Sequence, residues 1–244
     1  MESTRFIWKP NPKEIEKTNI YQSMQILGFD TYETFWQWSV DRSAAFWEFV
    51  THTLEIPFIQ KPSQILDLSQ GVTQPLWFKG AQFNIVDACF KSKPKALALV
   101  FQNEDAQIEN WTYGQLEKLV NRIAHGLQQN HLQKGDRIAL DLPMHVEAVA
   151  LYLAAIKAGL TVVTIADSFS PEEIAIRLEI TQPKMVFTQD YMLRNGKKLP
   201  LFEKVSSVFS GKIVLISQDA LLLRTQDVLW GDFLSNDDSF TSVV

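Results

Sequence analysis

The sequence predicts an α/β fold in which a small, aromatic-rich helical N-terminal region precedes a mainly parallel sheet with helices on both faces. Strand-like and helix-like patterns alternate from residue 95 to residue 217. The strand segments are short continuous apolar runs, which is typical of strands covered on both faces. Five of the seven tryptophans lie in the first 90 residues. We therefore assign residues 1–90 to the helical region, 91–234 to a partial α/β domain and 235–244 to a tail.

Two short helices are expected in the N-terminal region. Asp30 and Glu33 have the spacing of a capping box, which would open a helix that carries Phe35, Trp36 and Trp38. Asp41 can cap a second helix, whose apolar residues repeat at helical spacing: Ala45, Phe46, Phe49, Val50 and Leu54. We expect the aromatic rings to pack a small helical layer onto a larger domain, and a ligand-binding aromatic box is the alternative.

The first half of the α/β region begins with a strand predicted over Ala96–Phe101. Thr112 and Gln115 form a capping box, and the helix that follows has one apolar face made of Leu116, Val120, Ile123 and Leu127. A strand over Ile138–Leu142 ends at Pro143. The next helix runs to about Ala158, and Gly159 is placed to end it in the left-handed conformation.

The second half continues the alternation with a β-branched strand over Leu160–Ile165. Ser170, Pro171 and Glu173 start a helix that ends before Pro183. Two more strands follow, with a helix between them: Met185–Thr188, residues 200–209 and Ile213–Ile216. This β-α-β-α-β-α-β-α-β order requires crossover helices, which favours a parallel sheet. The acidic tail after Leu234 is expected to be weakly ordered.

Composition excludes several classes of protein. With 46% hydrophobic and 21% charged residues the chain is globular, and a net charge of −5 gives no basic footprint for nucleic acid. The longest apolar run, Ala148–Ile156, is too short to span a membrane. The single cysteine, Cys89, excludes an intrachain disulfide and suits a reducing compartment. Since no secretory signal is visible, we expect a cytoplasmic protein, and a peroxisomal location stays open if the native C-terminus lies beyond Val244.

Common catalytic and nucleotide-binding motifs are missing from the sequence. No two glycines have the G-x-G spacing, and neither a G-x-x-x-x-G-K loop nor a G-x-S-x-G elbow occurs. The four histidines lie in separate predicted elements. We therefore assign no catalytic residue and no metal ligand from motifs alone.

Six phrases in order along the chain carry a family resemblance. They are Tyr32–Val40 with Phe46–Trp47, Gly80–Asp87, Trp111–Leu116, Lys134–Ala139, Phe169–Glu172 and Arg194–Lys197. Together they resemble the N-terminal portion of acetyl-CoA synthetase-like acyl-activating enzymes, which belong to the adenylate-forming, AMP-binding superfamily. The resemblance covers about residues 19–234.

The resemblance implies a two-step ligase reaction. A carboxylic acid and Mg-ATP give an acyl-adenylate and pyrophosphate, and the CoA thiol then displaces AMP. ATP, Mg and CoA would serve the complete enzyme, and none of them is assigned firmly to these 244 residues. The family's Ser/Thr/Gly-rich phosphate loop does not occur in the sequence. We therefore expect an N-terminal fragment that is inactive alone, and the acyl substrate stays undetermined.

One segment resembles a CoA-contacting turn of the family. Arg194, Asn195, Gly196 and Lys197 match "R-G-G-[RK]", which the resemblance places at the 3′-phosphate and adenine region of CoA. Asn195 departs from the first glycine of that pattern, but asparagine tolerates a left-handed turn. An ordinary solvated turn is the alternative. The acid Asp167 stands where acetate-type members have glycine, which puts CoA recognition of the acetate type in doubt.

Two other functions fit the same residues. The chain could be a non-catalytic α/β module that binds a CoA-like ligand or a partner chain. It could also be one half of a split enzyme completed by a complementary chain. If later residues complete the sheet, the strand at 96–101 and the apolar helix face at 116–127 would lack partners and promote association.

Overall fold

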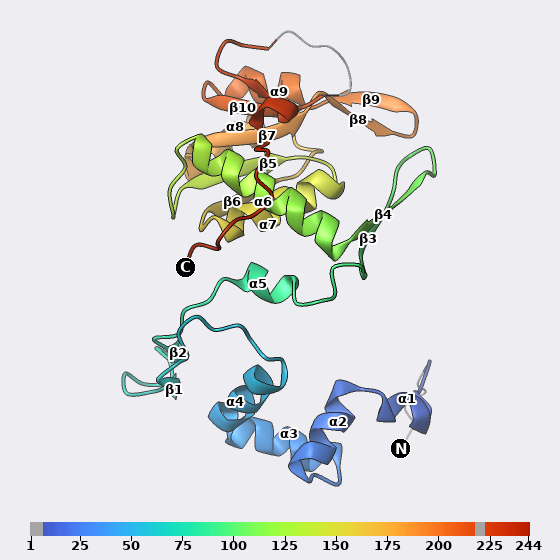
Figure 1. Ribbon diagram of the computed structural model, residues 1–244, viewed down its shortest axis with the longest axis vertical. Coiled ribbons are helices and arrows are strands. Elements are labelled where there is room, and N and C mark those ends of the chain that lie inside the picture. The colour runs from blue at the N-terminus through green and yellow to red at the C-terminus, as the bar shows by residue number, and fades with distance from the viewer. Residues whose placement is uncertain (1–6, 218–222) are drawn as a thin grey trace. The chain divides into compact units, whose positions relative to one another are not determined.

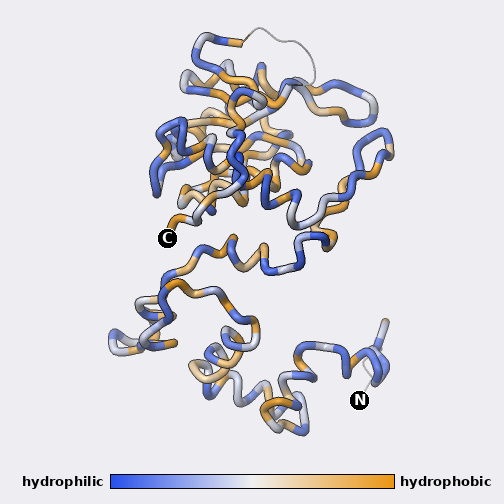
Figure 2. The backbone as a smooth tube through the Cα atoms, in the orientation of Figure 1, coloured by the Kyte–Doolittle hydropathy of each residue, from blue (hydrophilic) through white to orange (hydrophobic). Residues whose placement is uncertain are grey.

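The computed structural model describes residues 7–217 and 223–244 (Figure 1). The chain forms two units, Met1–Gln82 and Phe83–Val244. Apolar segments concentrate inside the second unit, and polar segments follow its loops (Figure 2). The second unit carries the sheet and the residues discussed below as a candidate site.

The first unit is built from short helices and one hairpin. The helices are α1 (Pro12–Glu16), α2 (Asn19–Leu27), α3 (Tyr32–Asp41) and α4 (Ser43–Thr53), and antiparallel strands β1 (Gln64–Asp67) and β2 (Leu76–Lys79) form the hairpin. The two helices expected from the sequence are α3 and α4, but their predicted caps are wrong. The Thr31 hydroxyl, one residue after Asp30, accepts the Thr34 N–H at 3.2 Å. The cap position of α4 is Arg42, which makes no side-chain cap.

Aromatic rings hold α3 and α4 together. Phe35 is buried, and its ring lies among those of Phe29, Trp38 and Phe46. Centroid separations in this group run from 5.4 Å for Phe29–Trp38 to 6.2 Å for Phe35–Phe46. These are the separations of tilted and edge-to-face ring pairs that stabilise a core. The rings pack a helical layer, as the sequence predicts.

The second unit confirms the predicted α/β architecture. Five parallel strands lie in the order β11-β10-β7-β5-β6: β11 (Val228–Leu229), β10 (Lys212–Ile216), β7 (Met185–Gln189), β5 (Arg137–Asp141) and β6 (Thr161–Ile165). One face is covered by α6 (Tyr113–Gln129), α7 (Val146–Lys157) and α10 (Trp230–Phe233). The other is covered by α8 (Pro171–Thr181) and α9 (Phe202–Val208). A short helix, α5 (Ile85–Cys89), precedes them.

The strand order creates a switch point between β5 and β7. The chain passes from β5 outward to β6 and then returns to β7 on the other side of β5. Loops after β5 and β7 therefore leave the sheet toward opposite faces. In open parallel sheets, ligands bind at the carboxyl ends of the strands that flank such a reversal.

A hairpin near the start of the second unit departs from the predicted alternation. The strand expected at Ala96–Phe101 is β3 (Leu97–Gln102), which pairs antiparallel with β4 (Ile108–Thr112) in a separate two-stranded sheet. The prediction that this strand joins the parallel sheet is wrong. A short connection, residues 103–107, links the two strands, so no crossover helix intervenes and only an antiparallel pair can form.

The expected weak order of the tail is also wrong. The Asn121 side chain donates to Asp238 O at 2.8 Å, and Arg122 Nε donates to Ser235 O at 2.7 Å. Asn84 Nδ2 donates to Val243 O at 2.8 Å. The tail thus runs beside α6 and α7 (Figure 1). Its backbone carbonyls accept from side chains on α6 and from Asn84 before α5, and its Val243 N–H donates to Lys157 O on α7.

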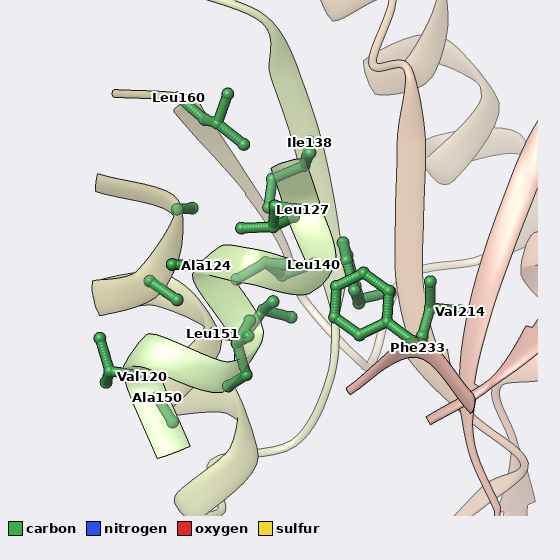
Figure 3. Packing of buried hydrophobic residues seen from close by; sticks show 14 of the residues in the cluster. Val120, Ala124, Leu127, Ile138, Leu140, Ala150, Leu151, Leu160, Val214 and Phe233 are labelled. Carbon is green, nitrogen blue, oxygen red and sulfur yellow. The ribbon is translucent and has the colours of Figure 1, made fainter. Parts of the chain in front are cut away.

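The apolar face of α6 is buried within the unit. Leu116, Val120, Ile123 and Leu127 are all buried. Figure 3 shows Val120 and Leu127 beside Ile138, Leu140 and Leu151 of the neighbouring elements. The expectation that this face lacks partners is therefore wrong, because α7 and the sheet cover it.

Removing the N-terminal cap of α8 tests how much the predicted capping box stabilises the protein. Ser170 Oγ accepts the Glu173 N–H at 3.3 Å, and Glu173 Oε2 accepts the Ser170 N–H at 2.9 Å. Ser170→Ala is expected to lower the free energy of unfolding by about 1 kcal/mol, measured by urea denaturation. The nearby exposed Ser168 provides the control, and Ser168→Ala should change stability little. Equal stability of the two variants would show that the capping box contributes nothing.

Candidate functional site

The segment that resembles a CoA-contacting turn forms the tip of a hairpin. Its strands are β8 (Tyr191–Arg194) and β9 (Lys197–Pro200). The backbone angle φ is 51° at Asn195 and 71° at Gly196. Two consecutive residues in the left-handed region are the signature of a type I′ turn, for which Asn-Gly is the favoured pair. The departure from glycine at Asn195 is therefore compatible with the turn.

The turn places two cations opposite each other. Arg194 and Lys197 are register partners across the hairpin, and both are exposed. Like charges at this position repel each other, so the pair is less favourable without an anion. Neither side chain forms an ion pair with any residue that the structure describes. One acid is near, because Glu104 Oε2 accepts the Asn195 N–H at 3.2 Å.

Neighbouring Lys198 is held on the other face of the hairpin. It pairs in register with Leu193, and its ammonium nitrogen lies 3.9 Å from the centroid of the Tyr191 ring. This distance gives a cation–π contact. Lys198 therefore differs from Arg194 and Lys197, whose side chains share a different face.

Polar residues collect at the carboxyl ends of β5 and β7. Asp141 ends β5, while Thr188 and Gln189 end β7 and Asp190 follows directly; all four are buried. The β8–β9 hairpin starts at the next residue, so it leaves the sheet at this same edge. Sequence reasoning missed this group. The available signal was an acid inside the apolar run at residues 138–142.

Asp141 is the most unusual residue at this edge. Its side chain is 0% exposed, and neither carboxylate oxygen has a hydrogen-bond partner among the described residues. Burial raises the pKa of Asp141 to about 7. The charge of Lys204 opposes this shift, and that of Asp167 adds to it. Near pH 7 the buried carboxyl group of Asp141 is therefore partly protonated and partly ionised.

Lys204 fixes the loop after β6. Its ammonium group donates to Asp167 O at 2.6 Å and to Phe169 O at 3.0 Å. The loop at residues 166–169 leads from the carboxyl end of β6 into α8. Lys204 lies on α9, so its side chain connects this helix to the loop that contains Asp167.

His145 connects the loop after β5 to the end of β7. Its Nδ1 accepts the Ala148 N–H at 3.1 Å and caps α7, and Nε2 donates to Gln189 Oε1 at 3.1 Å. Glu147 Oε2 lies 3.1 Å from the same Nδ1. The contact with His145 holds the pKa of Glu147 below its usual range.

A cleft of about 580 Å³ opens beside the carboxyl ends of β5 and β6. Apolar side chains from β5, β6 and α7 form most of its lining, among them Leu142, Val149 and Leu153. Arg177 also lines the cleft, and its guanidinium carbon lies 3.9 Å from the centroid of the Phe169 ring. The volume is in the range of small-molecule sites.

The residues present do not fit Mg-ATP. No group of three His, Cys, Asp or Glu side chains in residues 7–217 and 223–244 is arranged to hold a metal ion. The sequence also lacks a Ser/Thr/Gly-rich loop that could cradle a triphosphate. None of the helices in the same ranges is both long and apolar enough to cross a bilayer.

Comparison with known proteins matches both regions of the chain. The family described as AMP-binding enzyme matches residues 86–237, and acetyl-coenzyme A synthetase N-terminus matches residues 32–89. "Probable acyl-activating enzyme 18, peroxisomal" from Arabidopsis thaliana is 36% identical, over 94% of this chain and 34% of that protein. "Hexanoyl-CoA synthase" from Cannabis sativa is 31% identical, over 96% and 36%.

A solved structure shares the fold. Acetoacetyl-CoA synthetase from Streptomyces lividans superposes with a TM-score of 0.87 at 21% identity, covering 96% of this chain and 38% of that one. The chain spans about a third of the length of the curated relatives named above. Because the AMP-binding enzyme match covers more than half of the chain and the other match covers α3, α4 and the β1–β2 hairpin, this chain belongs to the AMP-binding enzyme family.

Proposed function

We propose that the chain is the N-terminal portion of an acetate–CoA-type, AMP-forming acyl-CoA ligase. The complete enzyme would convert a carboxylate, ATP and CoA to acyl-CoA, AMP and pyrophosphate through an acyl-adenylate. The observation that carries the proposal is the ordered pair of family matches, with the N-terminal match followed directly by the AMP-binding match. Relatives named as CoA ligases align along nearly all of the chain.

In this reaction the described residues would bind the nucleotide end of CoA. Arg194 and Lys197 would hold its 3′-phosphate, while Asn195 and Gly196 supply the tight turn that brings the two cations together. Charge-assisted hydrogen bonds to phosphate are stronger than neutral ones, and an anion also relieves repulsion between the paired cations. The thiol end of CoA takes no assigned contact here.

Binding of CoA tests this assignment against a matched ligand. Arg194→Ala and Lys197→Ala are each expected to weaken CoA binding about tenfold or more, since each removes a charge-assisted contact. Dephospho-CoA lacks the 3′-phosphate, so the two variants should bind it as tightly as the wild type does. Calorimetric titration measures both ligands. Lys198→Ala, on the other face of the hairpin, is the control. Equal losses for CoA and dephospho-CoA would contradict a phosphate contact.

We also propose that residues 1–244 are inactive alone and need a complementary chain or segment. The missing phosphate loop supports this view, because pyrophosphate release needs donors that neutralise developing charge. Purified 1–244 should give no ATP–pyrophosphate exchange with acetate or hexanoate. A complete acetyl-CoA synthetase serves as the positive control. Sustained exchange by the 244 residues would overturn the proposed inactivity.

The second candidate is a non-catalytic module that binds a CoA-like ligand or a partner chain. The burial of the α6 face and the contacts of the tail favour it, because they give the second unit a closed core. The mass of the native protein discriminates the two. A species far heavier than 27.9 kDa supports the enzyme portion, and a species at 27.9 kDa supports the module.

For location, we propose the cytoplasm, with the peroxisome as the alternative suggested by the name of the Arabidopsis relative. The single exposed cysteine suits a reducing compartment. Fluorescence microscopy of the tagged native protein beside a peroxisomal marker distinguishes the two locations.

A further inference from the structure

The loop at residues 166–169 is held mainly from outside itself. Lys204 reaches it from α9 and donates to two of its carbonyls, those of Asp167 and Phe169. Within the loop, the Phe169 N–H donates to Ala166 O at 3.0 Å. Removing the ammonium group would leave this turn and the contact of Arg177 with the Phe169 ring to hold the loop. The loop's position therefore depends on where Lys204 points.

The carboxyl group of Asp141, in the sheet, can compete with the loop carbonyls for the same ammonium group. Asp141 faces the α8–α9 side, since it alternates with Leu140, whose side chain packs on the α6–α7 side. Its register neighbours on β6 and β7, Ile165 and Thr188, carry no charge. Among the described residues, the charged groups that act on Asp141 are Lys204 from α9 and Asp167 from the loop.

The protonation state of Asp141 decides how strongly it competes for Lys204. A neutral carboxyl group attracts an ammonium ion no more than the loop carbonyls do. An ionised carboxylate attracts it much more, because two opposite charges interact strongly in a buried, low-dielectric environment. Since both carboxylate oxygens lack partners among the described residues, ionisation leaves a buried charge that only a moving cation can neutralise.

We propose that Lys204 is the positioning residue of a proton-controlled latch on the loop at residues 166–169. While Asp141 keeps its proton, Lys204 holds the loop carbonyls. When Asp141 loses its proton to solvent, the ammonium group turns to the carboxylate and releases the loop. The O–H bond of Asp141 is the one covalent bond that breaks, and its proton goes to solvent. The latch deepens the proposed function and rests on it in one respect, namely that the loop borders the edge where CoA would bind.

Hydrogen exchange on the full 244-residue chain measures the latch directly. The Phe169 amide reports the loop, and the Thr161 amide, which donates to Asp136 O at 2.8 Å at the opposite end of β6, is the internal control. After correction for intrinsic exchange, protection of Phe169 should fall about tenfold from pH 6 to pH 8. Protection of Thr161 should stay the same. Unchanged protection of Phe169 across this range would overturn the proposal.

Four variants separate a latch from simple structural support. Asp141→Asn should keep the pH 6 protection at both pH values, and Lys204→Met should give low protection at both. Lys204→Arg keeps the charge and should restore the wild-type value at pH 6. Lys212→Met removes an ammonium group that contacts Asn130 at the amino end of β10. Its Phe169 protection should equal that of the wild type at both pH values. A pH-dependent fall that persists in Asp141→Asn contradicts the latch. If that variant does not fold, the pH dependence of Lys204→Met decides, and a fall in Phe169 protection from pH 6 to pH 8 that persists without the ammonium group contradicts the latch.

Titration with CoA keeps the two proposals distinguishable. If CoA fails to bind while the exchange results hold, the proposed function fails and the latch stands. If CoA binds through Arg194 and Lys197 while Phe169 protection ignores pH and both Asp141 and Lys204 variants, the latch fails and the proposed function stands. Where both hold, the change in CoA affinity between pH 6 and pH 8 should differ between the wild type and Asp141→Asn, because ionisation of the 3′-phosphate itself affects both proteins equally.

Discussion

Replacing Asp141 with asparagine is expected to remove about 3 kcal/mol of pH-dependent destabilisation between pH 5 and pH 8. The pKa of this buried carboxyl is raised from 3.8 to about 7. In the unfolded chain it ionises near its usual pKa. The group therefore costs nothing below pH 3.8, and its stability penalty grows as the pH rises toward 7. Above pH 7 the penalty is constant.

The measurement is the difference in unfolding free energy between the wild type and Asp141→Asn across pH 5 to 8, from urea denaturation followed by amide signals of residues 83–244. Asp136 offers a control of opposite sign, because Lys184 contacts it at 2.8 Å and holds its pKa below the usual value. Asp136→Asn should therefore bring no gain at pH 8. Parallel pH profiles of the wild type and Asp141→Asn would show that Asp141 ionises normally.

Gly126→Ala is expected to destabilise the second unit by about 1–3 kcal/mol, although alanine favours helix by about 1 kcal/mol. A Cβ atom at Gly126 would lie 2.4 Å from Phe233 O and 3.0 Å from Phe233 Cζ. Phe233 is 2% exposed, and its ring centroid lies 5.2 Å from that of Phe187. Because a backbone oxygen cannot rotate away, α10 must move and the buried ring loses contacts.

Gly231→Ala is the matched control for this substitution, because a Cβ atom there meets nothing within 4 Å. It should be neutral or slightly stabilising. Urea denaturation gives the stability of both variants, and the near-ultraviolet signal of Trp230 reports the position of α10. A Gly126→Ala protein as stable as the wild type would mean that α10 adjusts without loss of packing.

Features that depend on near neighbours in the chain follow from the local sequence alone. The capping boxes at Thr112 and Ser170 form as predicted, and Gly159 adopts a φ of 75° just after α7. The apolar face of α6 and the parallel strands also follow from periodicity and run length. At the site, Asn195 and Gly196 fix a turn through their own backbone preferences, so the pairing of Arg194 with Lys197 followed.

Only the tertiary structure decided what each element packs against. The β3–β4 pair stays outside the parallel sheet, and the tail lies on α6 and α7, because distant side chains supply its hydrogen-bond donors. Likewise, no local pattern places Asp141 near Lys204. Asp141 lies on the face of the sheet that α9 covers, so the charge of Lys204 acts on it, and burial in this arrangement is what shifts the proton affinity of Asp141.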